Sequence, residues 1–259
     1  NAMGQIYDSG DFRNILNKTL ALADWQGFDE RHRLSLANGR LRGRGLSTFL
    51  EWTGGDAFTE KVQVRVEGAG RIRIWSGTQA MGQGLETCYM QLAAEQFGVG
   101  MDVIDIIQGD TDVVTGIGSI GSRSLFVGGA AVVSGAEKTI EAGRERAAMA
   151  LEAAAQDIEY SRGHFAIAGT DRSVSLFDLA AREHGGVIMV DADCTVGGAS
   201  WPNGCHICEI EIDRETGMIA LDRFAAVDDV GNPVNPMIVG GQIHGGIAQG
   251  VGEALMEQI

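Results

Sequence analysis

The feature that most constrains the fold is a glycine- and glutamine-rich segment directly before a helical pattern, in GTQAMGQGLETCYMQLAAEQFG at residues 77–98. Glycine is a poor helix former, so three glycines here indicate a turn in which the backbone comes close to something. Alternating strands are expected at 62–76, and a helix at about 85–97. From the residues alone, a cofactor or nucleotide-like ligand and a tightly packed turn explain this turn equally well.

A similar order of elements is expected near the end of the chain. Two alternating strands at 205–229 are joined by a turn at 214–217, and a loop, a glycine- and glutamine-rich stretch and a helix follow. This echo of the first segment predicts an α+β fold made of two sheet-plus-helix layers. Further helices are expected at 11–28 and 129–156.

Composition excludes several classes of function. The net charge of -15 repels a phosphate backbone, which argues against nucleic-acid binding. Hydrophobic residues make up 44% of the chain, enough for a core, but no apolar run reaches the length of about 18 residues that a membrane span needs. The first three residues resemble a tag remnant and are left out of the fold argument. Without a signal peptide, a cytoplasmic location is expected, the alternative being a periplasmic enzyme whose signal lies on another subunit.

Neither the cysteines nor the histidines predict a metal site. Cys205 and Cys208 lie in the alternating pattern CHICEIEID, where residues three apart point to opposite faces of a strand. Buried or edge thiols are therefore favoured over a zinc or redox pair. The histidines show no ligand spacing, and we expect no metal ligand in this chain.

Common nucleotide motifs do not account for the glycine–glutamine turn. It lacks the Lys and Ser/Thr of a P-loop, and residues 82–87 do not match the dinucleotide fingerprint. A glutamine amide offers two donors and an acceptor, which suits the edge of a heterocycle or an oxo ligand better than bare phosphate.

Five separated motifs, in order over nearly the whole chain, resemble the molybdenum-binding subunit of the xanthine dehydrogenase, aldehyde oxidase and carbon monoxide dehydrogenase family. The motifs are YDSGDF, GTQAMGQGLET, QGDTD with GSIGSRS, NGCHICEIEIDRETG and VDDVGNPVNPMIVGGQIHGGIAQGVGEAL. The resemblance implies the molybdopterin-binding domain of the molybdenum hydroxylases. It divides the chain into an N-terminal helix and strand (1–61), a first molybdopterin-binding segment (62–157), a small strand–helix insert with its connection (158–204) and a second molybdopterin-binding segment (205–259).

The resemblance gives Gln83 the catalytic position, where its amide approaches an oxygen ligand of the molybdenum centre. Met81, Gly82 and Gly84 would supply backbone that approaches the cofactor closely. The alternative for Gln83 is a glutamine in a surface turn.

The remaining cofactor contacts come from two further stretches. By resemblance, one loop holds the phosphates and pterin edge of the dinucleotide, and two glutamines near the end of the chain approach the pterin. These residues are Gly121, Ser122, Arg123 and Ser124 in the loop, Gln242, and the weaker candidate Gln249. A flexible serine-rich loop and ordinary helix packing are the respective alternatives.

The family's molybdenum subunit is roughly three times longer than this chain, which therefore resembles a middle-to-C-terminal fragment or one product of a split subunit. Glu253 in GVGEAL looks like the catalytic Gly-x-Gly-Glu motif, but its spacing from Gln242 favours an acid in the first turn of a helix. We therefore expect the isolated chain to be inactive, because the catalytic glutamate lies outside it.

The intact enzyme implied by the resemblance is an oxidoreductase that hydroxylates an aldehyde or an N-heterocycle. Its cofactor would be molybdopterin cytosine dinucleotide with molybdenum, which the intact complex would bind. Its partners would be the remaining half of the molybdenum subunit, [2Fe-2S] and FAD subunits, and a second copy of the chain in a homodimer. The alternatives are a non-catalytic homologue that folds without cofactor and an ordinary nucleotide-binding module.

Overall fold

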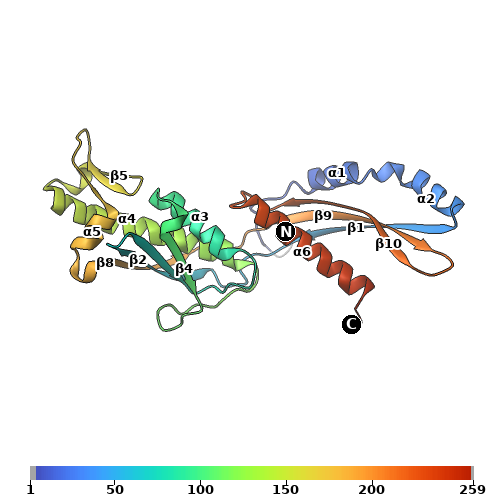
Figure 1. The fold of residues 1–259 in the computed structure, drawn as a ribbon. Coiled ribbons are helices and arrows are strands. Elements are labelled where there is room, and N and C mark those ends of the chain that lie inside the picture. Colours follow the sequence, from blue (N-terminus) through green and yellow to red (C-terminus); the bar gives the residue numbers. More distant parts are fainter. Residues whose placement is uncertain (1–3, 258–259) are drawn as a thin grey trace. The chain divides into compact units, whose positions relative to one another are not determined.

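The computed structural model describes residues 4–257, which form two compact units (Figure 1). Unit 1 contains the described residues up to Thr53 together with Ser200–Asn232, and unit 2 contains Gly54–Ala199 together with the chain from Pro233 onward. Each unit is therefore built from two separate stretches of sequence. This arrangement differs from the linear division into four segments, because a strand near the N-terminus pairs with strands near the C-terminus.

Unit 1 is an antiparallel sheet with two helices on one face. Its strand order is β1–β9–β10, with the long strand β9 in the centre. In the register of the sheet, Ile207 of β9 lies opposite Leu46 of β1 and Ala225 of β10, so these three residues share one face of the sheet. Ala23, at the end of α1, is buried with Ile207 and Ala225. The elements of unit 1 are α1 (Phe12–Leu22), a 3-10 turn (Trp25–Gly27), α2 (Phe28–Ala37), β1 (Arg40–Leu50), β9 (Asn203–Asp213) and β10 (Ile219–Asp229).

Charged residues, rather than apolar ones, fill the space between α2 and the sheet. Glu209 is 2% exposed and accepts hydrogen bonds from Arg31 Nε at 3.0 Å and Arg42 Nη1 at 2.8 Å. Glu211, the next residue on the same face, accepts from Ser35 Oγ at 2.6 Å and from Arg42 Nη2 at 2.9 Å. Because buried charges are costly unless they are paired, this network fixes α2 on the sheet.

The Glu211 contacts predict a specific acid sensitivity. The Ser35 hydroxyl, Arg40 and Arg42 lower the pKa of Glu211 from its ordinary value of 4.5 to about 2. A carboxylate with a lowered pKa in the folded state stabilises the fold above its unfolded pKa, and this contribution is lost as the pH falls. The free energy of unfolding of unit 1 is therefore expected to decrease between pH 4.5 and about 2.

Urea unfolding of the intact protein at several pH values across this window measures the effect. Glu211→Gln should flatten the pH dependence, because its side chain no longer titrates. Glu215→Gln, at an exposed turn position of the same unit, is the matched control and should leave the dependence as in the wild type. Equal pH dependence in the wild type and Glu211→Gln would contradict the assignment.

Unit 2 is a four-stranded sheet with order β4–β3–β2–β8, covered by helices. Strands β2, β3 and β8 are antiparallel neighbours, whereas β4 runs parallel to β3 after the crossover through α3. The alternation in KVQVRV directs Val62, Val64 and Val66 to the buried face, as the sequence predicts. The main elements are β2 (Thr59–Glu67), β3 (Arg71–Ser76), α3 (Leu85–Phe97), β4 (Ile104–Gln108), α4 (Gly129–Leu151), α5 (Leu176–Arg182) and β8 (Val187–Thr195).

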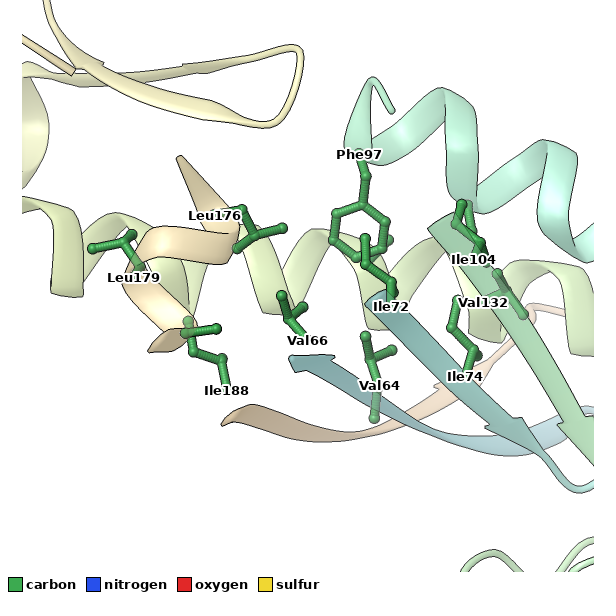
Figure 2. Packing of buried hydrophobic residues seen from close by; sticks show 14 of the residues in the cluster. Val64, Val66, Ile72, Ile74, Phe97, Ile104, Val132, Leu176, Leu179 and Ile188 are labelled. Atoms are coloured by element: carbon green, nitrogen blue, oxygen red, sulfur yellow. The ribbon is translucent and has the colours of Figure 1, made fainter. Parts of the chain in front are cut away.

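The core of unit 2 lies between this sheet and its helices. Figure 2 shows Val64 and Ile72 of the sheet pointing toward Phe97 of α3, with Val132 of α4 in the same layer. Close packing requires Gly135 on α4, because a Cβ there would lie 2.8 Å from the Val62 side chain. A small antiparallel sheet of β5 (Ile158–Ser161), β6 (His164–Ile167) and β7 (Ser173–Ser175), and helix α6 (Pro236–Leu255), complete the unit.

The structure confirms the α+β class and the two sheet-and-helix layers, but it corrects two details. The pattern at 11–28 is not one helix, because Asp24 adopts a left-handed conformation (φ 48°) and separates α1 from α2. The expected glycine-rich stretch before the last helix is wrong as well: residues 240–250 lie inside α6. Asn235 caps this helix by accepting from the Ile238 N–H, and Pro236 occupies its first turn, so the helix begins earlier than its glycines suggest.

Candidate functional site

The glycine–glutamine turn at 77–84 forms a compact loop in unit 2 that ends at the start of α3. Gly82 (φ 89°) and Gly84 (φ 77°) adopt left-handed conformations, which glycine reaches without strain. The Gln83 side chain folds back over the loop: its Oε1 accepts from the Met81 N–H at 2.5 Å, and its Nε2 donates to the Gln79 carbonyl at 3.0 Å. The amide is thereby held in one orientation, with its second N–H left for another acceptor.

The serine–glycine loop at 115–124 lies directly against this turn. Gly118 donates its N–H to the Gly77 carbonyl at 3.2 Å. The Ser119 hydroxyl accepts from the Gln79 N–H at 3.0 Å and donates to the Gln79 carbonyl at 2.6 Å. The structure thus brings together two motifs that lie about 40 residues apart in the sequence, and Gln79 links Ser119 to Gln83.

Glycines allow the two loops to approach this closely. A Cβ on Gly116 would lie 2.5 Å from the Cα and carbonyl oxygen of Gly77. A second close approach joins Gly121 to the segment before β2, where a Cβ would lie 2.8 Å from Gly55 Cα. The Gly54 N–H also donates to the Gly121 carbonyl at 2.8 Å. These glycines therefore pack backbone against backbone, while the positions beside Gly82 and Gly118 remain open.

Arg123, which the resemblance places against the cofactor phosphates, points into the protein. Its side chain is fully buried and forms an ion pair with Glu60 at 2.6 Å. The same guanidinium donates to the carbonyls of Ala57 (3.0 Å), Gly118 (2.9 Å) and Thr59 (2.9 Å). The neighbouring Gly121 and Ser122 are exposed and left-handed, with φ of 52° and 55°.

Ser124 begins a π-helical turn (Ser124–Gly128) that continues into α4. The Tyr89 hydroxyl of α3 donates to the Ser124 carbonyl at 2.5 Å, and the Thr78 hydroxyl lies 3.0 Å from the same phenol oxygen. Burial raises the pKa of Tyr89 to about 12, so the phenol stays protonated as a donor. Gly128 leaves room for it, since a Cβ there would lie 2.1 Å from the Tyr89 hydroxyl. Such π-turns are frequent at functional sites.

Glu60 and Tyr89 are the residues of this site that the sequence did not indicate. Glu60 lies on the same face of β2 as Val62 and Val64, so its place in the alternation indicates burial, but carboxylates are rarely buried without a partner and the sequence does not show that partner. Tyr89 lies on the buried face of an amphipathic helix and reads as core. Local patterns indicate that both side chains are buried, but not their partners, because Arg123 and Ser124 lie far along the sequence.

The two glutamines of α6 form no hydrogen bond with the loops at 77–84 and 115–124 among the described residues, although Ile238 of α6 packs against Gly84. Both side chains are exposed. Gln249 Nε2 donates to Glu253 Oε1 at 3.4 Å, whereas Gln242 forms no side-chain hydrogen bond within residues 4–257. The start of α6 does reach α3, since Asn235 Nδ2 donates to Gln91 at 2.9 Å. The assignment of Glu253 to a first helical turn is wrong, because α6 begins at Pro236 and places Glu253 near its C-terminal end.

The two cysteines agree with the expectation of buried or edge thiols, and a nearby aspartate pairs with a histidine. Cys205 is buried and Cys208 half-buried. Asp228 Oδ1 lies 3.0 Å from His206 Nε2 on the neighbouring strand, so the carboxylate pairs with a histidine and not with another carboxylate. Among residues 4–257, no group of three or more histidine, cysteine, aspartate or glutamate side chains is arranged to hold a metal ion. Nor does any helix in this part of the chain have the length and apolar character to cross a membrane.

Comparison with known proteins settles the family. A family model described as a molybdopterin cofactor-binding domain matches residues 18–259. The chain belongs to this family. It is 33% identical over 264 residues to subunit gamma of the 6-hydroxypseudooxynicotine dehydrogenase complex of Paenarthrobacter nicotinovorans, covering 97% of this chain and 33% of that subunit. It is 32% identical to the carbon monoxide dehydrogenase large chain of Hydrogenophaga pseudoflava, covering 98% of this chain and 34% of the relative.

Solved structures agree with this assignment. Quinoline 2-oxidoreductase from Pseudomonas putida 86 matches 100% of this molybdopterin cofactor-binding domain with a TM-score of 0.87 and 28% identity. The Cu,Mo-containing carbon monoxide dehydrogenase matches 93% of it with a TM-score of 0.79 and 28% identity. The chain spans about one third of the length of these proteins. The family resemblance drawn from the motifs is therefore confirmed.

Proposed function

We propose that the loops at 77–84 and 115–124 hold the molybdopterin cofactor of a molybdenum hydroxylase, in its cytosine dinucleotide form. The observation that carries this proposal is the single assembly formed by the two loops, in which Ser119 and Gln79 fix the Gln83 amide. The intact protein would be an oxidoreductase that hydroxylates an aldehyde or an N-heterocycle. The cofactor supplies the redox chemistry, and this chain supplies an oriented set of hydrogen-bonding groups around it.

The residues present fit such a group. The second Nε2 hydrogen of Gln83 is a donor for an oxygen atom or a ring nitrogen. Gly82 and Gly118 leave open space beside the loops, where a side chain would otherwise stand. The first N–H groups of α3, from Leu85 onward, have no acceptor within the helix and favour negative charge. Gln242 and Gln249 remain proposed pterin contacts, from the exposed face of α6.

The partners and location are part of the same proposal. Relatives are named as a subunit of a complex or as a large chain, and this chain spans about one third of each. We therefore infer that the remaining part of the molybdenum subunit, a [2Fe-2S] subunit and an FAD subunit complete the enzyme, with a homodimer as its assembly and the cytoplasm as its location. The second candidate is a non-catalytic homologue without cofactor.

Metal analysis of the intact protein, purified with its neighbouring subunits, separates the two candidates. Stoichiometric molybdenum, with cytidine monophosphate released on acid hydrolysis, supports the hydroxylase and the cytosine form. A well-formed complex without molybdenum supports the non-catalytic homologue and overturns the proposal.

Substitution of Gln83 tests the site itself. Gln83→Glu keeps the acceptor for the Met81 N–H but loses both donors, and Gln83→Ala loses all of these groups. Each change is expected to lower turnover more than cofactor content, by about 1–3 kcal/mol in the barrier, or roughly 5- to 150-fold. The control is Gln96→Ala, at the opposite end of α3. Unchanged turnover in both Gln83 variants would refute the catalytic position.

A further inference from the structure

The buried Arg123–Glu60 pair has no role in the function proposed so far. We infer that Arg123 is a positioning residue: with Glu60 it locks the 115–122 loop in the cofactor-binding shape, and it does not itself bind a cofactor phosphate. This inference rests on the proposed function, since it concerns the same site. It replaces the arginine–phosphate contact that the motif suggests with a contact made through the backbone.

The first support is the direction and use of the guanidinium. Arg123 is 0% exposed, and three of its nitrogens donate to protein acceptors. Two of these acceptors, the carbonyls of Ala57 and Thr59, lie in the segment entering β2, and a third, the carbonyl of Gly118, lies in the loop. The planar guanidinium of Arg123 thus joins the loop to the sheet, with a set of donors that the ammonium group of a lysine cannot reproduce.

The second support is charge. Glu60 is 2% exposed and lies 2.6 Å from Arg123 Nη1, so the pair presents no net charge to a ligand. The other carboxylate oxygen of Glu60 accepts the Lys61 N–H at 2.9 Å. Arg123 could bind a pyrophosphate only if its buried ion pair with Glu60 were broken, and breaking a buried ion pair is costly.

The third support is the place where the pair acts. Gly77, at the start of the glycine–glutamine turn, lies so close that a Cβ there would be 2.6 Å from Glu60 Oε1 and 2.7 Å from Gly116 Cα. Glu60 therefore lies under the point where the two loops meet, and Arg123 is the residue where the loop turns into the π-helix. A shift of either side chain would move Gly118 and Ser119, and with them the Gln79–Gln83 contacts.

Two conservative variants distinguish positioning from direct binding. Glu60→Gln keeps the size of the side chain but removes the charge that holds the guanidinium. If Arg123 binds phosphate, this change frees the cation and keeps or raises cofactor affinity; if Arg123 positions the loop, cofactor content falls. Arg123→Lys keeps a cation for phosphate but loses the fork, so positioning predicts a loss here as well. The matched control is Arg73→Lys, which changes a half-exposed ion pair in the same unit.

The readouts are cofactor content of the intact protein and hydrogen exchange in its cofactor-free form. In both variants we expect cofactor content to fall and amide exchange within 115–122 to rise roughly tenfold or more, as expected when a charge-assisted hydrogen bond is lost. Exchange in the middle of α4 should stay as in the wild type.

Three results would overturn the inference. One is retained or raised cofactor content in Glu60→Gln, and another is unchanged exchange at 115–122 in both variants. The third is an equal rise in α4, which would make the pair a general stabiliser of unit 2. A wild-type protein without cofactor would instead refute the proposed function, while the exchange measurements would still decide whether the pair holds the loop.

Discussion

Replacement of Glu209 with alanine is expected to destabilise unit 1 by about 3–5 kcal/mol, the cost of removing one partner from a buried charge network. Glu209 is 2% exposed, and the side chains of Arg31 and Arg42 are 13% and 8% exposed. Without the carboxylate, both guanidinium groups stay buried with fewer acceptors. Equilibrium unfolding in urea, followed by hydrogen exchange of β1 and β9, measures the loss.

The matched control for Glu209→Ala is Glu30→Ala on the outer side of α2. Glu30 pairs with Arg33 at 2.6 Å, but both side chains are more than 60% exposed. Exposed pairs contribute about 0–1 kcal/mol, so this variant should unfold almost as the wild type does. A loss below about 1 kcal/mol for Glu209→Ala would show that the network contributes no more than a surface pair.

Gly116→Ala is the second change with a large expected effect. The added Cβ would lie 2.5 Å from the Cα and carbonyl oxygen of Gly77, and neither atom can move as a flexible side chain does. The two loops must separate, at a cost of about 1–3 kcal/mol for overpacking. Cofactor content of the intact protein is expected to fall at least as much as in Glu60→Gln and Arg123→Lys.

Gly197→Ala is the control for this change, because a Cβ there would meet nothing within 4 Å. Both glycines belong to unit 2, so the comparison isolates the contact between the loops. Normal cofactor content in Gly116→Ala, with unfolding as in the wild type, would contradict the close packing of Gly77 and Gly116.

Local patterns predicted much of this fold. The alternation in KVQVRV predicted a strand and its buried face. CHICEIEID predicted a strand, but its buried face carries Glu209 beside Cys205 and Ile207, because Arg31 and Arg42 pair with that carboxylate. Strand β8 was not predicted, although Ile188, Val190 and Ala192 alternate with exposed residues in its sequence. Its pairing with β2, far earlier in the chain, could not be read from a local pattern.

The site shows the same limit. The motifs placed Gln83 and the 115–124 loop in one pocket by resemblance, and the structure brings these two segments together. The direction of Arg123 could not be predicted, because a loop arginine beside serines is typical of both a phosphate ligand and a buried ion pair. Only the position of Glu60, 63 residues away in the sequence, gives the arginine its partner. The role of Gln242 and Gln249 stays a prediction.

The division of the chain also determines the order in which the protein can fold during synthesis. Strand β1 leaves the ribosome before its partner β9, which follows only after the 146 residues of Gly54–Ala199, all of which belong to unit 2. Most of unit 2 can therefore become compact while β1 still has an unpaired edge. Late closure of so long a loop is slow, and the waiting strand is exposed to wrong pairing.

The charged helix α2, next to β1 in sequence, contacts its strand without waiting, and the arginines of β1 discourage association with other edges. The buried carboxylates of β9 then complete the network only when the last strand arrives. The sheet of unit 1 is thus completed only after residues 54–199 of unit 2 have been synthesised.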